Sequence, residues 1–566
     1  MKRSKRLISM LVATAGLTLA ANHKVAPDLL RPTSAKVDVI VQFTAAPTEH
    51  HHQKVLSRGG VLTHDLSGVI RGAAYSVPAS AIADLADDPE VAYVAPDRPL
   101  HGTLNYTAAA VNASVAWSQY ALDGTGIGVA VIDSGISNHP DLKTPAGKLR
   151  VVWSQDFVGG GTDDHYGHGG HVAGIIAGNG ASSTGAAYNM TFKGIAPNAN
   201  LINLRVLDQN GNGTDSAVIS AINTAIRLKN TYNIRVINLS LGRPVFESYK
   251  LDPLCQAVEA AWNAGIVVVI AAGNEGRNNS AGTNGYSTIT APGNDPYVIT
   301  VGAMKTLETA TRNDDLIASY SSKGPTPIDH IVKPDLVAPG NRVVSLLMST
   351  ASLDKTYPQN TIKNTYYETT NAGSLSNYYF KLSGTSMAAP VVSGAAALLL
   401  QSNSALTPDQ VKAILMKTAY KTFPQSSVAV DPLTGFSYES QYDIFTVGAG
   451  YLDIAAALAN SGLPPSATGS ALSPTAVVTS VNGVPTVLVV NTSLTAVWGS
   501  TAVWGSTAVW GSSLFVNSNT AVWGSTAVWG STAVWGSTAV WGSTAVWGST
   551  SNDSVEEVAT AIYGEN

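Results

Sequence analysis

One segment, a short motif with a glycine and a serine followed by a long apolar stretch, constrains the fold of this chain more than any other segment. Residues 384–389 have the sequence GTSMAA, Pro390 follows, and residues 391–400 are VVSGAAALLL. The apolar, alanine-rich stretch predicts a long buried helix entered through a tight loop. Pro390 is expected in the first turn of this helix, where a missing N–H has no partner. Ser386 would then lie at the helix N-terminus.

The expected position of Ser386 suits a nucleophile. A helix N-terminus offers free backbone N–H groups and a partial positive charge, which stabilise an anion such as the one formed in acyl transfer. Serine is also a preferred helix N-cap, so this residue alone does not distinguish a nucleophile from a cap. A serine nucleophile needs a histidine that takes its proton and a carboxylate that orients the histidine. Both partners must come from other segments.

Two further segments supply these partners. Residues 128–135, GVAVIDSG, predict a buried parallel strand with Asp133 at its C-terminal end, where open α/β sheets place functional residues. Residues 164–174 are DHYGHGGHVAG, and His168 is the first histidine of their HGxH unit. With the serine segment, these motifs resemble those of the subtilisin-like serine proteases (subtilases, peptidase S8 family) in type and in chain order. The resemblance implies a catalytic triad of Asp133, His168 and Ser386 and no cofactor for the chemistry.

Two positions refine this resemblance. Residues 267–276 are VVVIAAGNEG, and Asn274 in this segment resembles the family's oxyanion asparagine. Its side-chain amide would share the developing negative charge with the backbone N–H of Ser386. The family usually has threonine where this chain has Gly170, which removes a hydroxyl and loosens the backbone beside the base. We expect activity to survive this departure.

The resemblance also implies where substrate binds. Residues 236–242, VINLSLG, predict a strand whose last three residues, Ser240, Leu241 and Gly242, match the family's substrate-binding edge. Backbone groups there would pair with an extended peptide, which gives affinity without choice of sequence. Gly273 is assigned to substrate binding as well. The expected substrates are therefore polypeptides.

The histidine segment admits a second interpretation. His165, His168 and His171 recur every three residues beside Asp163 and Asp164, a spacing that is also found in metal sites. Intervening glycines break a regular helix, and no cluster of cysteine or glutamate completes a ligand set, so catalysis is favoured over metal ligation. His171 is expected to be a packed, hydrogen-bonded structural residue.

A structural calcium ion is the one metal that the resemblance suggests. Residues 139–142, HPDL, resemble a family segment whose aspartate contributes to a calcium site, and such an ion requires carboxylate and carbonyl oxygens. Asp141 is the only ligand that we assign. The family's other ligand loop, near residues 178–188, does not match well.

The N-terminal residues predict export. Residues 1–6 are MKRSKR, residues 7–19 are mostly apolar, and small residues follow at 20 and 21, which together indicate a signal peptide over 1–21 and a secreted protein. No later stretch has about eighteen consecutive apolar residues, so no membrane span is expected in the mature protein. A net charge of −5 gives no argument for nucleic acid as a partner. The single cysteine, Cys255, excludes an internal disulfide and is expected to be a buried thiol.

Residues 35–100 predict a separate module. Apolar periodicity indicates the order β-α-β-β-α-β, which suits a ferredoxin-like fold. In the family this position holds an inhibitory propeptide, so the resemblance implies a zymogen inhibited by its own propeptide. Self-cleavage is expected between Leu100 and Ala113. The catalytic domain follows as residues 105–463.

The C-terminal part changes character after a linker at 464–494. The hexapeptide TAVWGS recurs over 495–550, and an acidic C-terminus spans 551–566. Because six is even, every tryptophan of an extended strand would lie on one face, which suits binding to polysaccharide, to a cell surface or to itself. A low-complexity tail with no fixed fold is an equal alternative.

Together these observations predict an α/β fold with a subtilisin-like, doubly wound, mostly parallel sheet. The predicted function is that of a secreted serine endopeptidase that works through an acyl-enzyme and is matured by propeptide removal. The alternative is a surface adhesion or matrix protein whose repeat tail has the main function.

Overall fold

The computed structural model describes most of the chain before residue 490. The described residues are 24–26, 29, 36–97, 99–102, 107, 109–280, 282–309, 312–369, 373–431, 435–481, 484–490, 514–516, 562 and 564–565. The expected signal peptide (1–21) lies outside them, and so do the TAVWGS repeats. The predictions for these two segments remain predictions.

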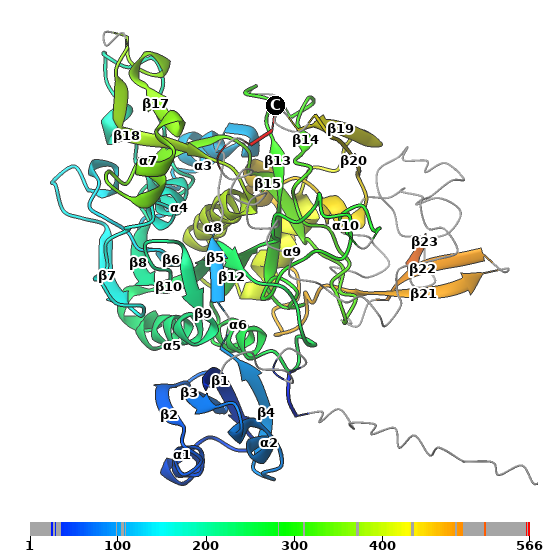
Figure 1. Ribbon diagram of the computed structural model, residues 1–566. Coiled ribbons are helices and arrows are strands. Elements are labelled where there is room, and N and C mark those ends of the chain that lie inside the picture. The colour runs from blue at the N-terminus through cyan, green and yellow to red at the C-terminus, as the bar shows by residue number, and fades with distance from the viewer. Residues whose placement is uncertain are drawn as a thin grey trace, which may run out of the picture.

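A mostly parallel sheet forms the centre of the molecule (Figure 1). Its strand order is β14-β13-β12-β10-β6-β8-β7, and β15 pairs with β13. Every pairing is parallel except that of β13 with β14. Runs of valine and isoleucine explain why the central strands β6, β10 and β12 are buried on both faces. The predicted α/β class and mostly parallel sheet are confirmed. The strands are β6 (Gly128–Asp133), β7 (Val151–Asp156), β8 (Asn200–Arg205), β10 (Ile234–Leu239), β12 (Val267–Ala271), β13 (Ile299–Lys305), β14 (Leu316–Ile317) and β15 (Leu336–Pro339).

Helices cover both faces of this sheet (Figure 1). On one face α4 (Gly169–Ala177) packs against α8 (Thr385–Ser402), and α8 lies along β10, β12 and β13. On the other face α5 (Asp215–Tyr232) and α6 (Pro253–Asn263) pack on each other and on the central strands. The doubly wound arrangement brings the carboxyl ends of β6, β10 and β12 to one edge, with the starts of α4 and α8 beside them.

Helix α8 is the buried helix that the sequence predicts, with one correction. Its residues from Thr385 to Leu400 are all buried. Pro390 lies inside the helix rather than in its first turn. Its missing N–H would have bonded the carbonyl of Ser386, four residues earlier, and the Ser240 hydroxyl donates to that carbonyl at 2.7 Å instead. Within the described residues α8 is also the one helix long and apolar enough to span a membrane, but 89% of it is buried, as in a core helix.

Smaller elements complete the large domain. They are α3 (Ala113–Gln119), β9 (Asn212–Thr214), β11 (Leu241–Gly242), β16 (Val343–Leu346), α7 (Ser352–Thr356), β17 (Thr361–Lys363), β18 (Leu375–Leu382), α9 (Pro408–Thr418), β19 (Ser426–Val430), β20 (Ser437–Gln441), α10 (Ile444–Val447) and α11 (Ile454–Ala459). Strands β16, β18 and β17 form a three-stranded sheet beside α4.

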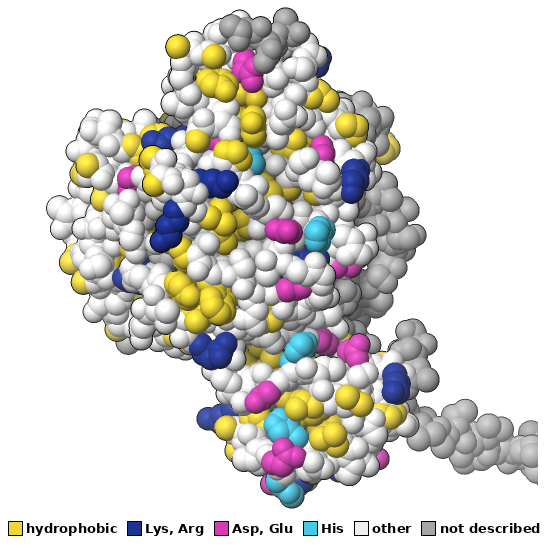
Figure 2. Space-filling view, turned by 90° about the vertical axis from the view of Figure 1, so that its left-hand side faces the viewer, with side chains coloured by type: hydrophobic (Ala, Val, Ile, Leu, Met, Phe, Trp, Pro, Cys, Tyr) yellow, Lys and Arg dark blue, Asp and Glu magenta, His cyan; other side chains and the backbone are white. Residues whose placement is uncertain are grey.

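The N-terminal module forms a separate lobe (Figures 1 and 2), and its strand β2 contacts α5. Its antiparallel sheet has the order β2-β3-β1-β4, and the order of elements along the chain is the expected β-α-β-β-α-β. Val39 and Val41 face the core of the module itself, whereas Ile40 between them joins the core of the large domain. The elements are β1 (Lys36–Phe43), α1 (Glu49–Leu56), β2 (Val61–Asp65), β3 (Gly72–Pro78), α2 (Ala81–Ala86) and β4 (Val91–Pro96).

The prediction that residues 464–494 form a linker is wrong in part. It contains an antiparallel hairpin of β21 (Thr475–Val481) and β22 (Val484–Val490), and β23 (Leu514–Val516) pairs with β22. The N–H of Ala476 donates to the carbonyl of His330 at 2.7 Å, and Ala476 and Val489 are buried. The large domain therefore extends past residue 463, because these apolar residues pack against it.

Candidate active site

Asp133 and His168 lie in direct contact at the carboxyl edge of the sheet. Asp133 is the last residue of β6, and its Oδ1 is 2.5 Å from Nδ1 of His168. The same oxygen accepts a hydrogen bond from the N–H of Ser134 at 2.7 Å. Asp133 and His168 are buried, at 1% and 0% exposure. A buried aspartate on Nδ1 fixes the ring orientation and leaves Nε2 as the nitrogen that exchanges a proton.

A second buried aspartate, Asp164, organises the loop that delivers His168. Its carboxylate accepts backbone hydrogen bonds from Gly167 at 2.7 Å and Gly170 at 2.8 Å, and a hydroxyl hydrogen bond from Ser134 at 2.8 Å. Burial raises the pKa of Asp164, and the negative charge of Asp133 raises it further, whereas the hydrogen bonds from these donors oppose the rise. In the sequence Asp164 stands out only as a neighbour of the histidines. The signal that could have identified its role is an aspartate followed by glycines just before a helix.

Ser386 is the second residue of α8 and is 1% exposed. Its hydroxyl donates to the carbonyl of Ser240 at 3.1 Å. Gly384 precedes the helix with φ 148°, in the region that favours glycine, and this conformation turns the chain into the helix. Since α8 packs against α4, Ser386 and His168 both lie at helix starts on the same edge of the sheet.

Asn274 follows β12 and is held by the residue before Ser386. Its Oδ1 accepts from the N–H of Thr385 at 2.9 Å and from the Thr385 hydroxyl at 3.2 Å. The Thr385 hydroxyl also accepts from the N–H of Gly273 at 3.1 Å. Because the carbonyl end of the Asn274 amide is engaged, its NH₂ end is the group oriented to donate elsewhere. Asn274 is 8% exposed, so such a donor acts where water is largely excluded.

The space beside Gly170 is filled by another side chain. A Cβ on Gly170 would lie 2.5 Å from both Cγ and Sδ of Met348. Met348 follows β16 and is buried. The methionine therefore takes the place that a threonine side chain would need, which explains how the backbone beside His168 stays packed without that side chain.

The predicted substrate-binding edge pairs with the chain's own backbone. Strand β11 pairs antiparallel with β5 (Pro99–Gly102), with Leu241 opposite Gly102 and Gly242 opposite His101. On its other side β5 pairs antiparallel with β9, with Pro99 opposite Thr214. The edge formed by β11 thus accepts an extended peptide strand by main-chain hydrogen bonding.

The three histidines of the motif have separate partners. His171 is fully buried, and its Nε2 contacts the carbonyl of Phe380 at 3.1 Å. Burial lowers the pKa of His171 to about 3, so it stays neutral. His165 is exposed and contacts the carbonyl of Gly160 at 3.4 Å. The structural role predicted for His171 fits this geometry, and among the described residues no three His, Cys, Asp or Glu side chains form a metal-binding group.

Cys255 is a buried thiol, as predicted. Its Sγ lies 3.3 Å from Oδ1 of Asn294, to which it donates. Burial raises the pKa of Cys255 well above its ordinary value, so the thiolate that a nucleophile needs is disfavoured.

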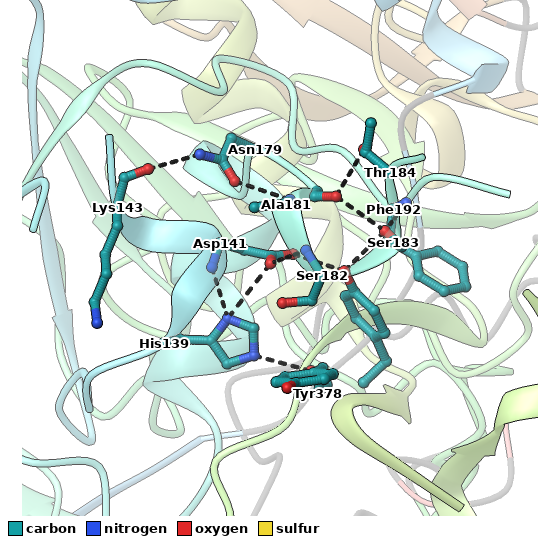
Figure 3. A network of polar contacts seen from close by, with 12 residues as sticks. His139, Asp141, Lys143, Asn179, Ala181, Ser182, Ser183, Thr184, Phe192 and Tyr378 are labelled. Carbon is teal, nitrogen blue, oxygen red and sulfur yellow. Dashed lines mark hydrogen bonds and ion pairs between the residues drawn. The ribbon is translucent and has the colours of Figure 1, made fainter. Parts of the chain in front are cut away.

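The carboxylate of Asp141, the expected calcium ligand, lies in a network of hydrogen bonds (Figure 3). One carboxylate oxygen accepts from the N–H of Ser182 at 2.8 Å, and the other accepts from the Tyr379 hydroxyl at 2.7 Å. His139 lies beside them, 3.9 Å from Oδ1. Calcium requires several oxygen ligands with free lone pairs, whereas this carboxylate is surrounded by hydrogen-bond donors. These contacts describe a carboxylate held by hydrogen-bond donors, and the assignment of Asp141 as a calcium ligand stays a prediction.

A buried arginine, Arg150, holds the backbone of this loop. The Arg150 guanidinium donates to three backbone carbonyls, those of Asp141 at 2.8 Å, Ala177 at 2.6 Å and Ala199 at 2.9 Å. Arg150 is 4% exposed. A guanidinium presents several donors in fixed directions, so it ties these three chain segments together without a metal.

Comparison with known proteins agrees with this architecture. The sequence model of the subtilase family matches residues 124–443. Serine protease AprX of Bacillus subtilis (strain 168) is 41% identical over 305 residues, which cover 52% of this chain and 61% of AprX, less than two thirds of its length. Subtilisin E of the same organism is 33% identical over 427 residues, which cover 74% of this chain and 94% of subtilisin E. Thermitase of Thermoactinomyces vulgaris is 34% identical over 329 residues, 58% of this chain and 92% of thermitase.

Proposed function

The chain belongs to the subtilase family of serine endopeptidases, and from this premise we propose that it cleaves polypeptides with Asp133, His168 and Ser386 as its catalytic triad. The observation that supports the assignment most strongly is the buried pair of Asp133 and His168, joined at 2.5 Å at the edge where α8 presents Ser386. The alternative in which the repeat tail has the main function gains no support from the relatives.

The proposed reaction uses each residue for one task. The Ser386 hydroxyl leaves the carbonyl of Ser240 and gives its proton to Nε2 of His168 as its oxygen attacks the scissile carbonyl carbon. Asp133 stabilises the imidazolium, which then protonates the leaving amine. The Asn274 amide and the Ser386 N–H hold the oxyanion. Water, activated by His168, resolves the acyl-enzyme, and no metal or cofactor takes part.

Substrate binding is proposed at the edge formed by Ser240, Leu241 and Gly242, with Gly273 beside it. The pairing of β5 with β11 supports this role, because β5 is an extended segment bound through its backbone. The contact between the Gly273 N–H and Thr385 couples this edge to the serine loop.

The module at 36–97 is proposed to be an inhibitory propeptide, and the protein to be secreted through the signal peptide predicted at 1–21. Two observations support the inhibitory role. Strand β2 of the module packs on α5, and the segment that follows the module, β5, lies between β11 and β9. A strand in that place competes with substrate for the same backbone groups.

Removal of the Ser386 hydroxyl tests the triad and the propeptide together. The experiment compares the intact mass and N-terminal sequence of the secreted wild type, Ser386→Ala and a matched control, Ser402→Ala, at the other end of α8. We expect the wild type and the control to lose the module, with a new N-terminus between residues 100 and 113, while Ser386→Ala retains it. Identical processing of all three would contradict self-maturation.

A further inference from the structure

The last described residues of the chain lie buried on the catalytic domain, far in sequence from anything they touch. Glu565 is 2% exposed. Its Oε1 accepts from Nη2 of Arg277 at 2.8 Å and from the N–H of Ser319 at 2.9 Å, and the Ser319 hydroxyl donates to it as well. Its Oε2 lies 3.2 Å from Nζ of Lys305. One carboxylate is therefore met by two buried cations and two neutral donors.

The backbone of the same segment is also held. The Asn341 side chain donates to the carbonyl of Glu565 at 2.9 Å and accepts from its N–H at 2.8 Å, as a paired strand would. The Asn360 amide donates to the carbonyl of Ile562 at 2.7 Å. A Cβ on Gly564 would collide with the Ser383 hydroxyl, so the chain approaches too closely for a side chain at this position.

The receiving surface is built for a negative charge. Lys305 lies on β13 and is 2% exposed, and Arg277 is buried between Glu565 and Asp431, with which it pairs at 2.7 Å. Buried cations are costly unless a carboxylate compensates them. The residues of this surface come from well-separated parts of the catalytic domain, so the whole fold assembles it and no single local turn does. They are Arg277, Lys305, Ser319, Asn341 and Asn360.

We propose that this surface is a docking site for an acidic peptide of the type Gly-Glu, and that its occupant is the C-terminal segment of this same chain. The described chain is thus held on the catalytic domain at β22, where Val489 is buried, and again at Ile562.

The docking site also adjoins the catalytic loops. Arg277 follows Asn274 by three residues, and Ser383 precedes Ser386 by three. Docking of Glu565 and Gly564 therefore supports the backbone on both sides of the proposed oxyanion hole. These are positioning contacts, because neither residue touches the reacting atoms.

Hydrogen exchange of the full chain tests the proposal directly, because the Ser319 N–H donates to Glu565. The measurement uses Ser386→Ala to prevent self-cleavage and compares Glu565→Gln, a deletion from Ile562 onward, and the matched control Glu557→Gln, which removes the same charge from the same segment. We expect exchange of the Ser319 amide to rise by about tenfold in the first two. The control should exchange like its parent.

A thermal double-mutant cycle provides the second readout. Glu565→Gln and Lys305→Met should each lower the unfolding midpoint, and together they should lower it by less than the sum, since each removes the other's partner. Unchanged exchange at Ser319 in Glu565→Gln would overturn the proposal, and so would additive shifts. An effect of the deletion without an effect of Glu565→Gln would overturn the role of the carboxylate.

Discussion

At the scale of single residues, the site depends on side chains that hold other side chains. Asp133 orients His168, Asp164 ties down the loop before it, and Thr385 fixes the amide of Asn274. Each of these contacts is buried, so each hydrogen bond acts in a medium of low polarity. The reacting groups are therefore oriented before substrate arrives, which is the condition for electrostatic catalysis.

Substitution of the proposed oxyanion donor should affect turnover more than binding. Asn274→Ala removes an amide proposed to donate to the charge that develops in the transition state, so we expect kcat to fall by about 10²–10³ with KM little changed. Steady-state kinetics on a peptide substrate measures both constants. A fall below about tenfold would show that Asn274 is not the donor.

The close approach of Gly170 and Met348 predicts that a threonine at position 170 destabilises the protein alone but much less when Met348 is also shortened. Gly170→Thr alone should lower the free energy of unfolding by about 1–3 kcal/mol, because its side chain meets Met348 at 2.5 Å. Combined with Met348→Ala, the threonine should recover most of that loss. Denaturant unfolding of the Ser386→Ala background measures this. Equal losses in the single and double variants would contradict the steric explanation.

At the scale of elements, hydrogen bonds hold the loop around Asp141. Arg150 links β7, α4 and the turn at Asp141, and Tyr379 of β18 closes the other side of the same aspartate. Phe192 and Tyr367 pack against Tyr379, with ring centroids 4.6 and 5.3 Å away. The rings of Phe192, Tyr367 and Tyr379 therefore support this loop by packing.

Chelation and substitution should separate these two ways of holding the loop. EDTA should leave the unfolding midpoint unchanged, whereas Arg150→Met should lower the free energy of unfolding by roughly 1.5–3 kcal/mol through lost charged hydrogen bonds. Differential scanning calorimetry of the same preparation checks both. A drop of several degrees with EDTA, reversed by added calcium, would restore the metal site.

The sequence predicted the elements better than the contacts between them. The apolar runs before Asp133 and Asn274 identify strands, and GTSMAA identifies a helix start, because these signals are local. The contact of Met348 with Gly170 and the hydrogen bond from Ser240 to Ser386 join residues that are far apart in the chain. The role of Asp164 depends on the geometry of its loop. No period or motif predicts such contacts. For the same reason the sequence predicts a linker where the structure has the hairpin at 475–490.

At the scale of the whole molecule, the N-terminal module and the C-terminal segment both dock on the catalytic domain. The module is held partly by Asp97, whose carboxylate accepts from the N–H of Ser216 at 2.6 Å and from its hydroxyl. Burial, with the nearby charge of Asp215, raises the pKa of Asp97 to about 7. Asp215 is itself paired with Arg243 at 3.0 Å.

This raised pKa predicts that the module binds less tightly as pH rises. The Asp97 carboxyl is protonated more easily when the module is docked than when it is free. Its contribution to the affinity of the module is therefore complete below the free pKa of about 3.8, and this contribution is lost as pH rises to about 7. Activation of the wild type should therefore be faster at pH 8 than at pH 5. Asp97→Asn, which stays neutral, should retain the module longer at pH 8 and flatten the profile. A pH dependence identical to that of the wild type would exclude Asp97 as its source.

The most direct test of the proposed nucleophile is its labelling by a fluorophosphonate, which reacts with an activated serine. Purified mature wild type and His168→Ala, separated from its module if it is retained, are treated alike, and the adduct is located by peptide mass spectrometry. We predict one adduct on Ser386 in the wild type and none in His168→Ala. An adduct on another residue, or equal labelling of both proteins, would contradict the assignment of Ser386 and His168.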